Sequence, residues 1–324
     1  MDAEALPTGA TASSLHAPIF LVGALRSGTT MFRLMLTHHR SIHFWGEFEY
    51  AVCQARGNSW PDLPDFLQWA ETDRDFINAR LQIDKTLTYP ELIRSFVAQH
   101  VARTDKPFFG ATVHSRFDLL PELWPDARFI HLLRDPRDVA RSVVQMGWAG
   151  HPFYSARHWV DVERRWDGLA KVVPAAQRFE LRYENLVRRP AAELTRVCAF
   201  LGLPYDPGML TYDRNSAYAL PDPALIEQWR SKLTRREVAL VEIACDDLLA
   251  ERGYVPVNVP AAVPGALERL QLAAVDRFNK TAFAINKLGW SLWTQRYVAR
   301  HIGTREWNRR LALEINLIEE RNLK

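Results

Sequence analysis

The chain has 324 residues, of which 48% are hydrophobic and 24% are charged, a composition typical of a globular protein with room for one α/β domain and an appendage. Its formal net charge of +3 lies far from the basic excess of nucleic-acid-binding proteins, so we expect no nucleic-acid partner. The three cysteines are widely separated and form neither a CxxC pair nor a zinc-ligand spacing, which predicts no metal site and a reduced, cytoplasmic setting.

The N-terminal segment, residues 1–17, is mostly small and polar and contains neither lysine nor arginine. It lacks the charged start and the apolar run of a secretory signal peptide, so we expect a disordered leader. No stretch of the chain approaches the roughly 18 uninterrupted apolar residues that a membrane-spanning helix requires.

Short apolar runs alternate with segments of helical spacing along the next part of the chain. We expect strands at residues 18–22, 128–133 and 178–183, and helices at residues 30–38, 135–146 and 190–201. The second helix starts on Asp135 and Pro136, and Gly202 follows the third, as is typical of helix ends. This alternation predicts a three-layer α/β/α domain with a central parallel sheet, resembling a P-loop NTPase.

A proline-punctuated stretch after Tyr254 predicts a domain boundary. We expect a main domain at residues 18–254, a linker at 255–265 and a helical C-terminal extension at 266–324. From Gly265 onward the chain has 11 Lys and Arg against 6 Asp and Glu, so this part carries +5 and the remainder −2. The extension is therefore the basic part of the protein.

A glycine-rich loop, Gly23-Ala-Leu-Arg-Ser-Gly-Thr-Thr30, joins the first strand to its helix. Its spacing equals a Walker A loop, except that Thr29 replaces the lysine. Glycines let backbone N–H groups turn toward a phosphate, and the helix N-terminus adds its dipole. Arg26 supplies a cation on the strand side. The loop thus suits a phosphate-like group without a γ-phosphate.

A second anion site is predicted where the 128–133 strand ends. Arg134 follows this strand and Ser142 lies two turns into the next helix. Ligands bind at the carboxyl ends of parallel strands, where an arginine can hold a phosphate bidentately and a serine hydroxyl can add a hydrogen bond. The alternative is that Arg134 pairs with Asp135 or Asp138 at the helix start.

Together these motifs resemble those of the PAPS-dependent sulfotransferase family, most closely its tyrosylprotein and carbohydrate branches and their bacterial relatives. The matching segments occur in order at residues 26–30, 134–142, 183–190 with 200–202, and 229–230 with 252–254. They cover nearly all of residues 18–254. The resemblance implies transfer of a sulfonate group from 3′-phosphoadenosine 5′-phosphosulfate (PAPS), with adenosine 3′,5′-bisphosphate as the product and no metal ion.

The resemblance also assigns the residues that bind the donor. The 5′-phosphosulfate is expected on the loop residues Arg26, Ser27, Gly28, Thr29 and Thr30. Arg134 and Ser142 are expected to hold the 3′-phosphate, and Tyr183 to lie near the nucleotide. A plainer interpretation of Tyr183 is a residue that ends a strand.

Sulfonate transfer needs a base for the acceptor proton and a cation for the leaving oxygen. Glu47, after Gly46, resembles the carboxylate base of the tyrosylprotein and carbohydrate branches, and Arg26 is the expected cationic clamp. Glu49 is an alternative base, on the same face if the segment is extended. His114 is a further alternative, because a histidine serves as base in the cytosolic branch.

The chain departs from the family at one position. Many relatives carry a lysine near the position of Thr112, where this chain has none. His114, Arg116 or Arg26 alone is left to supply the missing charge. A P-loop kinase or NTPase and a non-catalytic nucleotide-binding module therefore remain alternative functions.

The acceptor is not determined by these residues. A sugar, a tyrosyl peptide, a small molecule or a lipid remains open, with a hydroxyl or an amine as the nucleophile. For the extension we consider packing on the main domain or on a second subunit, contact of Trp290 and Trp293 with an anionic membrane, and shaping of the acceptor cleft.

Overall fold

Five parallel strands form the centre of the fold, in the order β2-β3-β1-β4-β5. The computed structural model describes residues 17–57, 59–257 and 262–322. The strands are β1 Ile19–Val22, β2 Ile42–Glu47, β3 Phe108–Val113, β4 Arg128–Leu133 and β5 Arg178–Arg182. The three predicted strands correspond to β1, β4 and β5, while β2 and β3 had no predicted counterpart.

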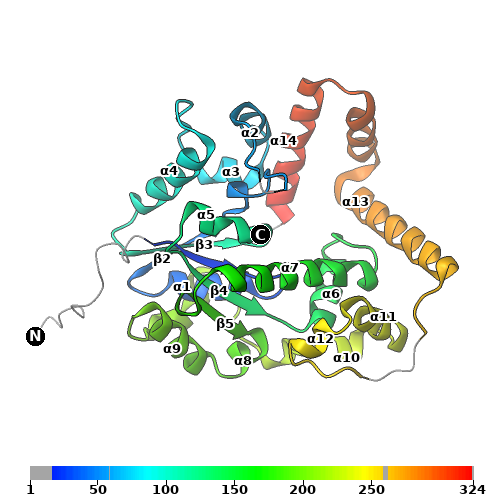
Figure 1. The fold of residues 1–324 in the computed structure, drawn as a ribbon. Coiled ribbons are helices and arrows are strands. Elements are labelled where there is room, and N and C mark those ends of the chain that lie inside the picture. The colour runs from blue at the N-terminus through cyan, green and yellow to red at the C-terminus, as the bar shows by residue number, and fades with distance from the viewer. Residues whose placement is uncertain (1–16, 58, 258–261, 323–324) are drawn as a thin grey trace, which may run out of the picture.

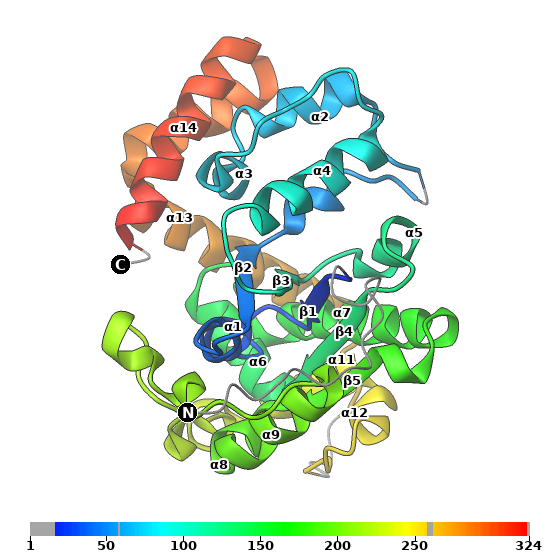
Figure 2. The same ribbon diagram turned by 90° about the vertical axis from the view of Figure 1, so that its left-hand side faces the viewer.

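Helices cover both faces of this sheet (Figure 1). They are α1 Thr29–Thr37, α2 Leu63–Ala70, α3 Arg74–Ala79, α4 Tyr89–Val101, α5 Leu120–Leu123, α6 Pro136–Gln145, α7 Pro152–Val172, α8 Tyr183–Arg188, α9 Pro190–Leu201, α10 Trp229–Lys232, α11 Arg235–Cys245 and α12 Leu248–Glu251. In Figure 2, α4 lies on one side of the strands and α8 and α9 lie on the other.

Alternation along the strands explains the two helical layers, because successive side chains of a strand point to opposite faces. In β1, Phe20 and Val22 belong to the core under α4 and α7, whereas Ile19 and Leu21 belong to the core under α1 and α9. Apolar residues at consecutive strand positions are therefore buried on both sides. The predicted three-layer α/β/α architecture is confirmed.

Local signals set the predicted helix ends. The Asp135 carboxylate accepts a hydrogen bond from the backbone N–H of Arg137 at the start of α6, with Pro136 in the first turn. Gly202 ends α9 in the left-handed conformation, with φ 73°. Tyr183 was placed at the end of the third strand, but it is the first residue of α8.

The C-terminal extension is helical, as predicted. It consists of α13 Ala266–Ile302, which bends at Gly289 (φ 76°, ψ 156°), and α14 Arg305–Asn322. The two helices share a small core of Leu292, Ala299, Leu311 and Ile315. The predicted leader lies outside the described residues except for Ala17, and so do residues 258–261 of the predicted linker.

The extension contacts the main domain at two separate places. The Asp276 carboxylate of α13 accepts hydrogen bonds from the backbone N–H groups of Gly150 and His151, which precede α7. At the other end, Glu319 of α14 forms an ion pair with Arg74 of α3, at 3.4 Å. The extension thus bridges two sides of the main domain (Figure 1). Within the described residues, no helix is both long enough and apolar enough to cross a bilayer.

The contact between α13 and the turn after α6 gives a test of this arrangement. Gly147 has φ 70°, and a Cβ at this position would overlap the ring of Phe283 in α13. We expect Gly147→Ala to lower the free energy of unfolding by about 1–3 kcal/mol, because the backbone becomes strained and the ring is displaced. Urea denaturation measures this change.

The matched control is Gly168→Ala, on the exposed side of α7, where a Cβ meets no atom within 4 Å. This change should raise stability by about 0.5–1 kcal/mol, because alanine favours the helix. A Gly147→Ala protein as stable as the wild type would mean that α13 is not held at this turn.

Candidate functional site

The glycine-rich loop turns tightly between β1 and α1. The backbone N–H of Ser27 donates to the carbonyl of Ala24 at 3.1 Å. Arg26 and Gly28 have φ of 72° and 98°, so two loop positions lie in the left-handed region. A Cβ at Gly28 would overlap the Tyr183 ring, so only glycine lets this ring pack on the loop.

The two predicted anion sites meet in the structure. The Arg26 Nε donates a hydrogen bond to the Ser142 Oγ at 3.0 Å, and Arg134 donates to the Arg26 carbonyl at 3.1 Å. The Arg134 guanidinium also lies over the Tyr183 ring, 4.1 Å from its centroid. Residues from the loop, α6 and α8 are therefore brought together by direct contacts.

The alternative, in which Arg134 mainly pairs with Asp135 or Asp138 at the start of α6, does not describe its closest contacts. Asp135 binds Arg137 at 2.8 Å instead. Asp138 lies 3.8 Å from Arg134, but its carboxylate accepts closer hydrogen bonds from the backbone N–H groups of Glu227 and Trp229. Arg134 remains oriented mainly by carbonyl oxygens and by the Tyr183 ring.

These residues surround a cavity of about 400 Å³. Of the predicted donor-binding residues, the ones that line it are Arg26, Gly28, Thr29, Thr30, Arg134, Ser142 and Tyr183. Ser27 does not line it, because its side chain is wholly buried beneath the loop. The cavity is thus a single space that all but one of the expected donor-binding residues face.

Positive charge predominates in this cavity. Three arginines line it against one acid, Asp222. Burial lowers the pKa of Arg26 below its ordinary value, and the nearby Arg134 guanidinium acts in the same direction. Cations crowded into a partly buried space favour an anionic ligand.

Sequence reasoning missed several residues of this cavity. The third arginine, Arg141, and Gln145 extend from α6, and Tyr218 and Gln228 come from the segment after α9. Arg141 could have been found, because it lies seven residues after Arg134 and next to Ser142 on the same helix. Tyr218 lies in an irregular segment that has no periodic signal.

The two acidic candidates for the base occupy different environments. Glu47 ends β2, whereas Glu49 starts a short 3₁₀ helix, so the extended segment assumed for the pair is interrupted. Glu49 accepts hydrogen bonds from the backbone N–H groups of His114 and Ser115, both at 2.8 Å. Glu49 therefore holds the turn after β3, while the Glu47 side chain remains 36% exposed.

His114 connects Glu47 to the glycine-rich loop. Its Nε2 lies 3.3 Å from the Glu47 carboxylate, and its Nδ1 lies 2.8 Å from the Gly23 carbonyl. Burial alone would lower the pKa of His114, but the carboxylates of Glu47 and Glu49 raise it to about 9. Both ring nitrogens then donate, and the ring is cationic at neutral pH.

The ionised form of Glu47 is favoured in turn. Burial opposes ionisation, but His114 and Arg33 of α1 lower the pKa of Glu47 below its ordinary value. The pair is therefore an imidazolium and a carboxylate at neutral pH. Arg33 is a further residue of this region that sequence reasoning missed.

The position of the missing lysine, Thr112, and one candidate for the compensating cation, Arg116, both have well-defined surroundings. Thr112 is buried in β3. Arg116 donates to the carbonyl oxygens of Ala55 and Gly57, so its guanidinium is held in that turn. Of the three candidates, His114 and Arg26 remain available next to the loop. Within the described part of the chain, no group of three or more His, Cys, Asp or Glu side chains is arranged to hold a metal ion.

Comparison with known proteins agrees with the motif resemblance. Residues 18–207 match the family model described as the sulfotransferase family. A sequence relative is the omega-hydroxy-beta-dihydromenaquinone-9 sulfotransferase Stf3 of Mycobacterium bovis, 28% identical over 156 residues, which are 43% of this chain and 38% of the relative. The nodulation protein NoeE of Sinorhizobium fredii is 29% identical over 81% of this chain and 71% of its own length.

A solved structure supports the fold. The sulfotransferase domain from the curacin biosynthetic pathway superposes with a TM-score of 0.50 at 18% identity, covering 74% of this chain and 98% of that domain. The matched region spans less than two fifths of the length of the mycobacterial relative. The family match ends at residue 207 and includes neither α13 nor α14.

The His114–Glu47 pair predicts a pH dependence of stability. The pKa of His114 is about 9 in the folded chain and about 6.5 in an unfolded one. Protonation of His114 therefore contributes to the free energy of unfolding in full below about pH 6.5, and this contribution is lost as the pH rises toward 9. We expect the stability difference between wild type and His114→Asn to shrink over that range, measured by urea denaturation.

The difference between the two proteins isolates His114. Burial would lower the pKa of His131, but Glu163 and Glu180 raise it to about 9 as well. Because His131 is present in both proteins, its titration does not change the difference between them. A stability difference that stays constant from pH 6.5 to 9 would contradict an ion pair between His114 and Glu47.

Proposed function

The chain belongs to the sulfotransferase family, and on this basis we propose that it transfers a sulfonate group from PAPS to an acceptor hydroxyl or amine. The observation that carries the proposal is the convergence of the loop with Arg134, Ser142 and Tyr183 on one cavity of about 400 Å³. A nucleotide with phosphate groups at both ends of its ribose fits two anion sites in one space. The 5′-phosphosulfate binds the loop at residues 26–30, and the 3′-phosphate binds Arg134 and Ser142.

In the proposed reaction, Glu47 accepts the proton of the acceptor nucleophile. A new bond forms from the nucleophile to sulfur while the bond from sulfur to the 5′-phosphate oxygen breaks, and the bisphosphate leaves with the bonding electrons. Arg26 and the loop N–H groups stabilise the charge on the leaving oxygen. The cationic ring of His114 orients Glu47 and supplies a second positive charge beside the loop.

A kinase or NTPase function has less support. Thr29 occupies the position of the lysine that binds the β- and γ-phosphates in Walker A loops. A non-catalytic nucleotide-binding module would have no use for an accessible, ionised carboxylate next to the loop. The Glu47 carboxylate is partly exposed and its lowered pKa keeps it ionised, which favours an enzyme.

The division of labour along the chain is part of the same proposal. Residues 18–254 carry the donor site, and residues 266–324 form an accessory extension on the acceptor side. The three cysteines are free thiols, which favours a reducing, cytoplasmic compartment. The names of similar proteins include a dihydromenaquinone, a protein-tyrosine and a carbohydrate sulfotransferase. We therefore leave the acceptor open among a sugar, a tyrosyl peptide, a small molecule and a lipid.

The nucleotide specificity can be tested by thermal unfolding. We expect adenosine 3′,5′-bisphosphate to raise the Tm, because it binds the folded chain alone. ATP with magnesium should raise it far less. Arg134→Ala should weaken bisphosphate binding by about 2–5 kcal/mol in calorimetry, because a buried charged contact is lost. The control is Arg165→Ala in α7, where the arginine pairs with Asp118 and lines no part of the donor cavity; it should bind as the wild type does. Equal stabilisation by ATP would overturn the assignment of Arg134 and Ser142.

The role of Glu47 can be separated from binding. Glu47→Gln keeps the side chain's size but removes the base, so turnover should fall by roughly 10²–10⁴ while bisphosphate affinity stays near that of the wild type. Turnover is measured with labelled donor and a panel of sugars, tyrosyl peptides, phenols and hydroxylated lipids. If Glu47→Gln keeps full turnover, Glu49 or His114 is the base instead. Absence of wild-type turnover on every acceptor would favour the non-catalytic module.

A further inference from the structure

The bend in α13 creates two neighbouring cavities outside the donor site. One, of about 570 Å³, lies between α13, α14 and α2. The other, of about 350 Å³, lies on the inner side of the bend, lined by residues from both halves of α13. Arg296 and Arg300 line both cavities, so the two spaces adjoin along this face of the helix.

The charges in these cavities are unbalanced. The larger cavity is lined by four arginines, Arg296, Arg300, Arg305 and Arg309, and by two acids, Glu71 and Glu319. The smaller cavity is lined by Arg277, Lys280, Arg296, Arg300 and His301 and by no acid. We call the four residues Arg277, Lys280, Arg296 and Arg300 the basic face.

Both acids of the larger cavity already form ion pairs with cations outside the basic face. Glu71 pairs with Arg305 at 3.3 Å and with Arg309 at 3.5 Å. Glu319 pairs with Arg74 at 3.4 Å and with Lys287 at 3.1 Å. These two acids therefore neutralise cations on the far wall of the larger cavity, and neither of them pairs with Arg296 or Arg300.

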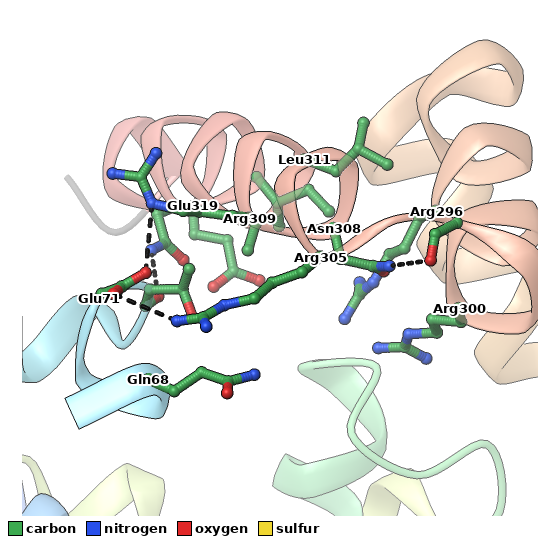
Figure 3. A pocket seen from close by; sticks show the side chains of 14 residues that line it. Gln68, Glu71, Arg296, Arg300, Arg305, Asn308, Arg309, Leu311 and Glu319 are labelled. Atoms are coloured by element: carbon green, nitrogen blue, oxygen red, sulfur yellow. Dashed lines mark hydrogen bonds and ion pairs between the residues drawn. The ribbon is translucent and has the colours of Figure 1, made fainter. Parts of the chain in front are cut away.

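The side chains of Arg296 and Arg300 make no ion pair or hydrogen bond with any residue that the structure describes. They lie four residues apart on one helix, an arrangement in which like charges destabilise each other. Burial lowers the pKa of Arg296, the charge of Arg300 lowers it further, and the charge of Glu319 opposes both. Figure 3 shows both side chains extending from α13 into the cavity, opposite Arg305 and Gln68.

The other members of the basic face are also poorly neutralised. Lys280 lies 3.9 Å from Asp276, whose carboxylate already accepts hydrogen bonds from Gly150 and His151. Beside the arginines, the rings of Trp293 and Tyr297 stack with centroids 5.7 Å apart and line the smaller cavity. The face thus combines free cations with a flat aromatic surface.

The extension that carries this face is linked to the region of Glu47 through Arg74. Arg74, which binds Glu319, also lowers the pKa of Glu47 through its charge. The first half of α13 packs on the turn after α6, the helix that carries Ser142. The extension therefore contacts the main domain both near the base and near the donor cavity.

We propose that the basic face binds a carboxylate or sulfate group of a soluble, anionic acceptor while another part of that acceptor reaches Glu47. This inference rests on the proposed sulfonate transfer. An anion there would relieve the repulsion between Arg296 and Arg300 and would form charge-assisted hydrogen bonds with both. The acceptor thus already carries negative charge before it is sulfated.

The test compares two double variants of the full chain. Arg296→Gln/Arg300→Gln removes two charges from the basic face. Arg235→Gln/Arg310→Gln removes two exposed arginines that line none of these cavities. The probe is a heparin-derived tetrasaccharide, titrated by calorimetry into protein saturated with adenosine 3′,5′-bisphosphate so that the donor site is blocked. We expect the first variant to bind the probe about tenfold more weakly or worse, and the control variant to bind it as the wild type does.

Several results would overturn the proposal. One is a wild type that does not bind the probe, or that binds neutral maltotetraose equally well. Another is an equal loss in both double variants, which would indicate non-specific charge attraction. A third result concerns the Arg296→Gln/Arg300→Gln variant. If it binds the tetrasaccharide as the wild type does but binds vesicles containing phosphatidylserine more weakly, the basic face belongs to a membrane contact. The affinity for adenosine 3′,5′-bisphosphate is measured first in each sample. If the protein does not bind the bisphosphate, the proposed function fails; if it does, a missing response to the probe contradicts only the proposal for the basic face.

Discussion

The buried ring of His114 is the contact on which the site depends. It lies at the end of β3 and reaches two other segments, the carbonyl of Gly23 in the loop and the carboxylate of Glu47 at the end of β2. A buried imidazolium is tolerated only when its charge and both N–H groups have partners. Neither the loop nor Glu47 can shift without leaving this charge unpaired, so the glycine-rich loop and the carboxylate are held at one relative position.

The donor cavity follows a related electrostatic rule. Among the described residues that line it, Arg26, Arg134 and Arg141 share this cavity with one acid. Their guanidinium groups are oriented mainly by neutral partners: a serine hydroxyl, backbone carbonyls, a glutamine and the face of Tyr183, with Asp138 farther from Arg134 at 3.8 Å. Partners of this kind fix a cation's direction without cancelling its charge. The positive potential therefore stays available to a ligand, which is what a phosphate site requires.

The extension, which lies beyond the residues matched by the family model, also contains arginines whose charge no carboxylate cancels. Where α14 meets α2 and α3, each arginine has a carboxylate, and these pairs dock the helix. On the inner side of the α13 bend, the arginines have no carboxylate partner in the part of the chain that the structure describes. The extension thus separates cations that hold it in place from cations that face open space, and the bend at Gly289 brings the second group together.

The sequence by itself determined the features that depend on neighbouring residues. The loop spacing, the start of α6 on Asp135 and the end of α9 at Gly202 are local, and so are the apolar runs of β1, β4 and β5. Tertiary structure alone decided which distant residues meet. Glu49 and His114 are 65 positions apart, and Gly23 and His114 are 91 apart. It also decided that Glu47 stays partly exposed while Glu49 holds a turn, and that Tyr183 packs on Gly28. It decided as well that Arg296 and Arg300 form no ion pair with an acid among the residues that the structure describes. Those outcomes depend on how strands order in a sheet and how helices cross, and no single segment encodes them because the free energy comes from contacts between segments.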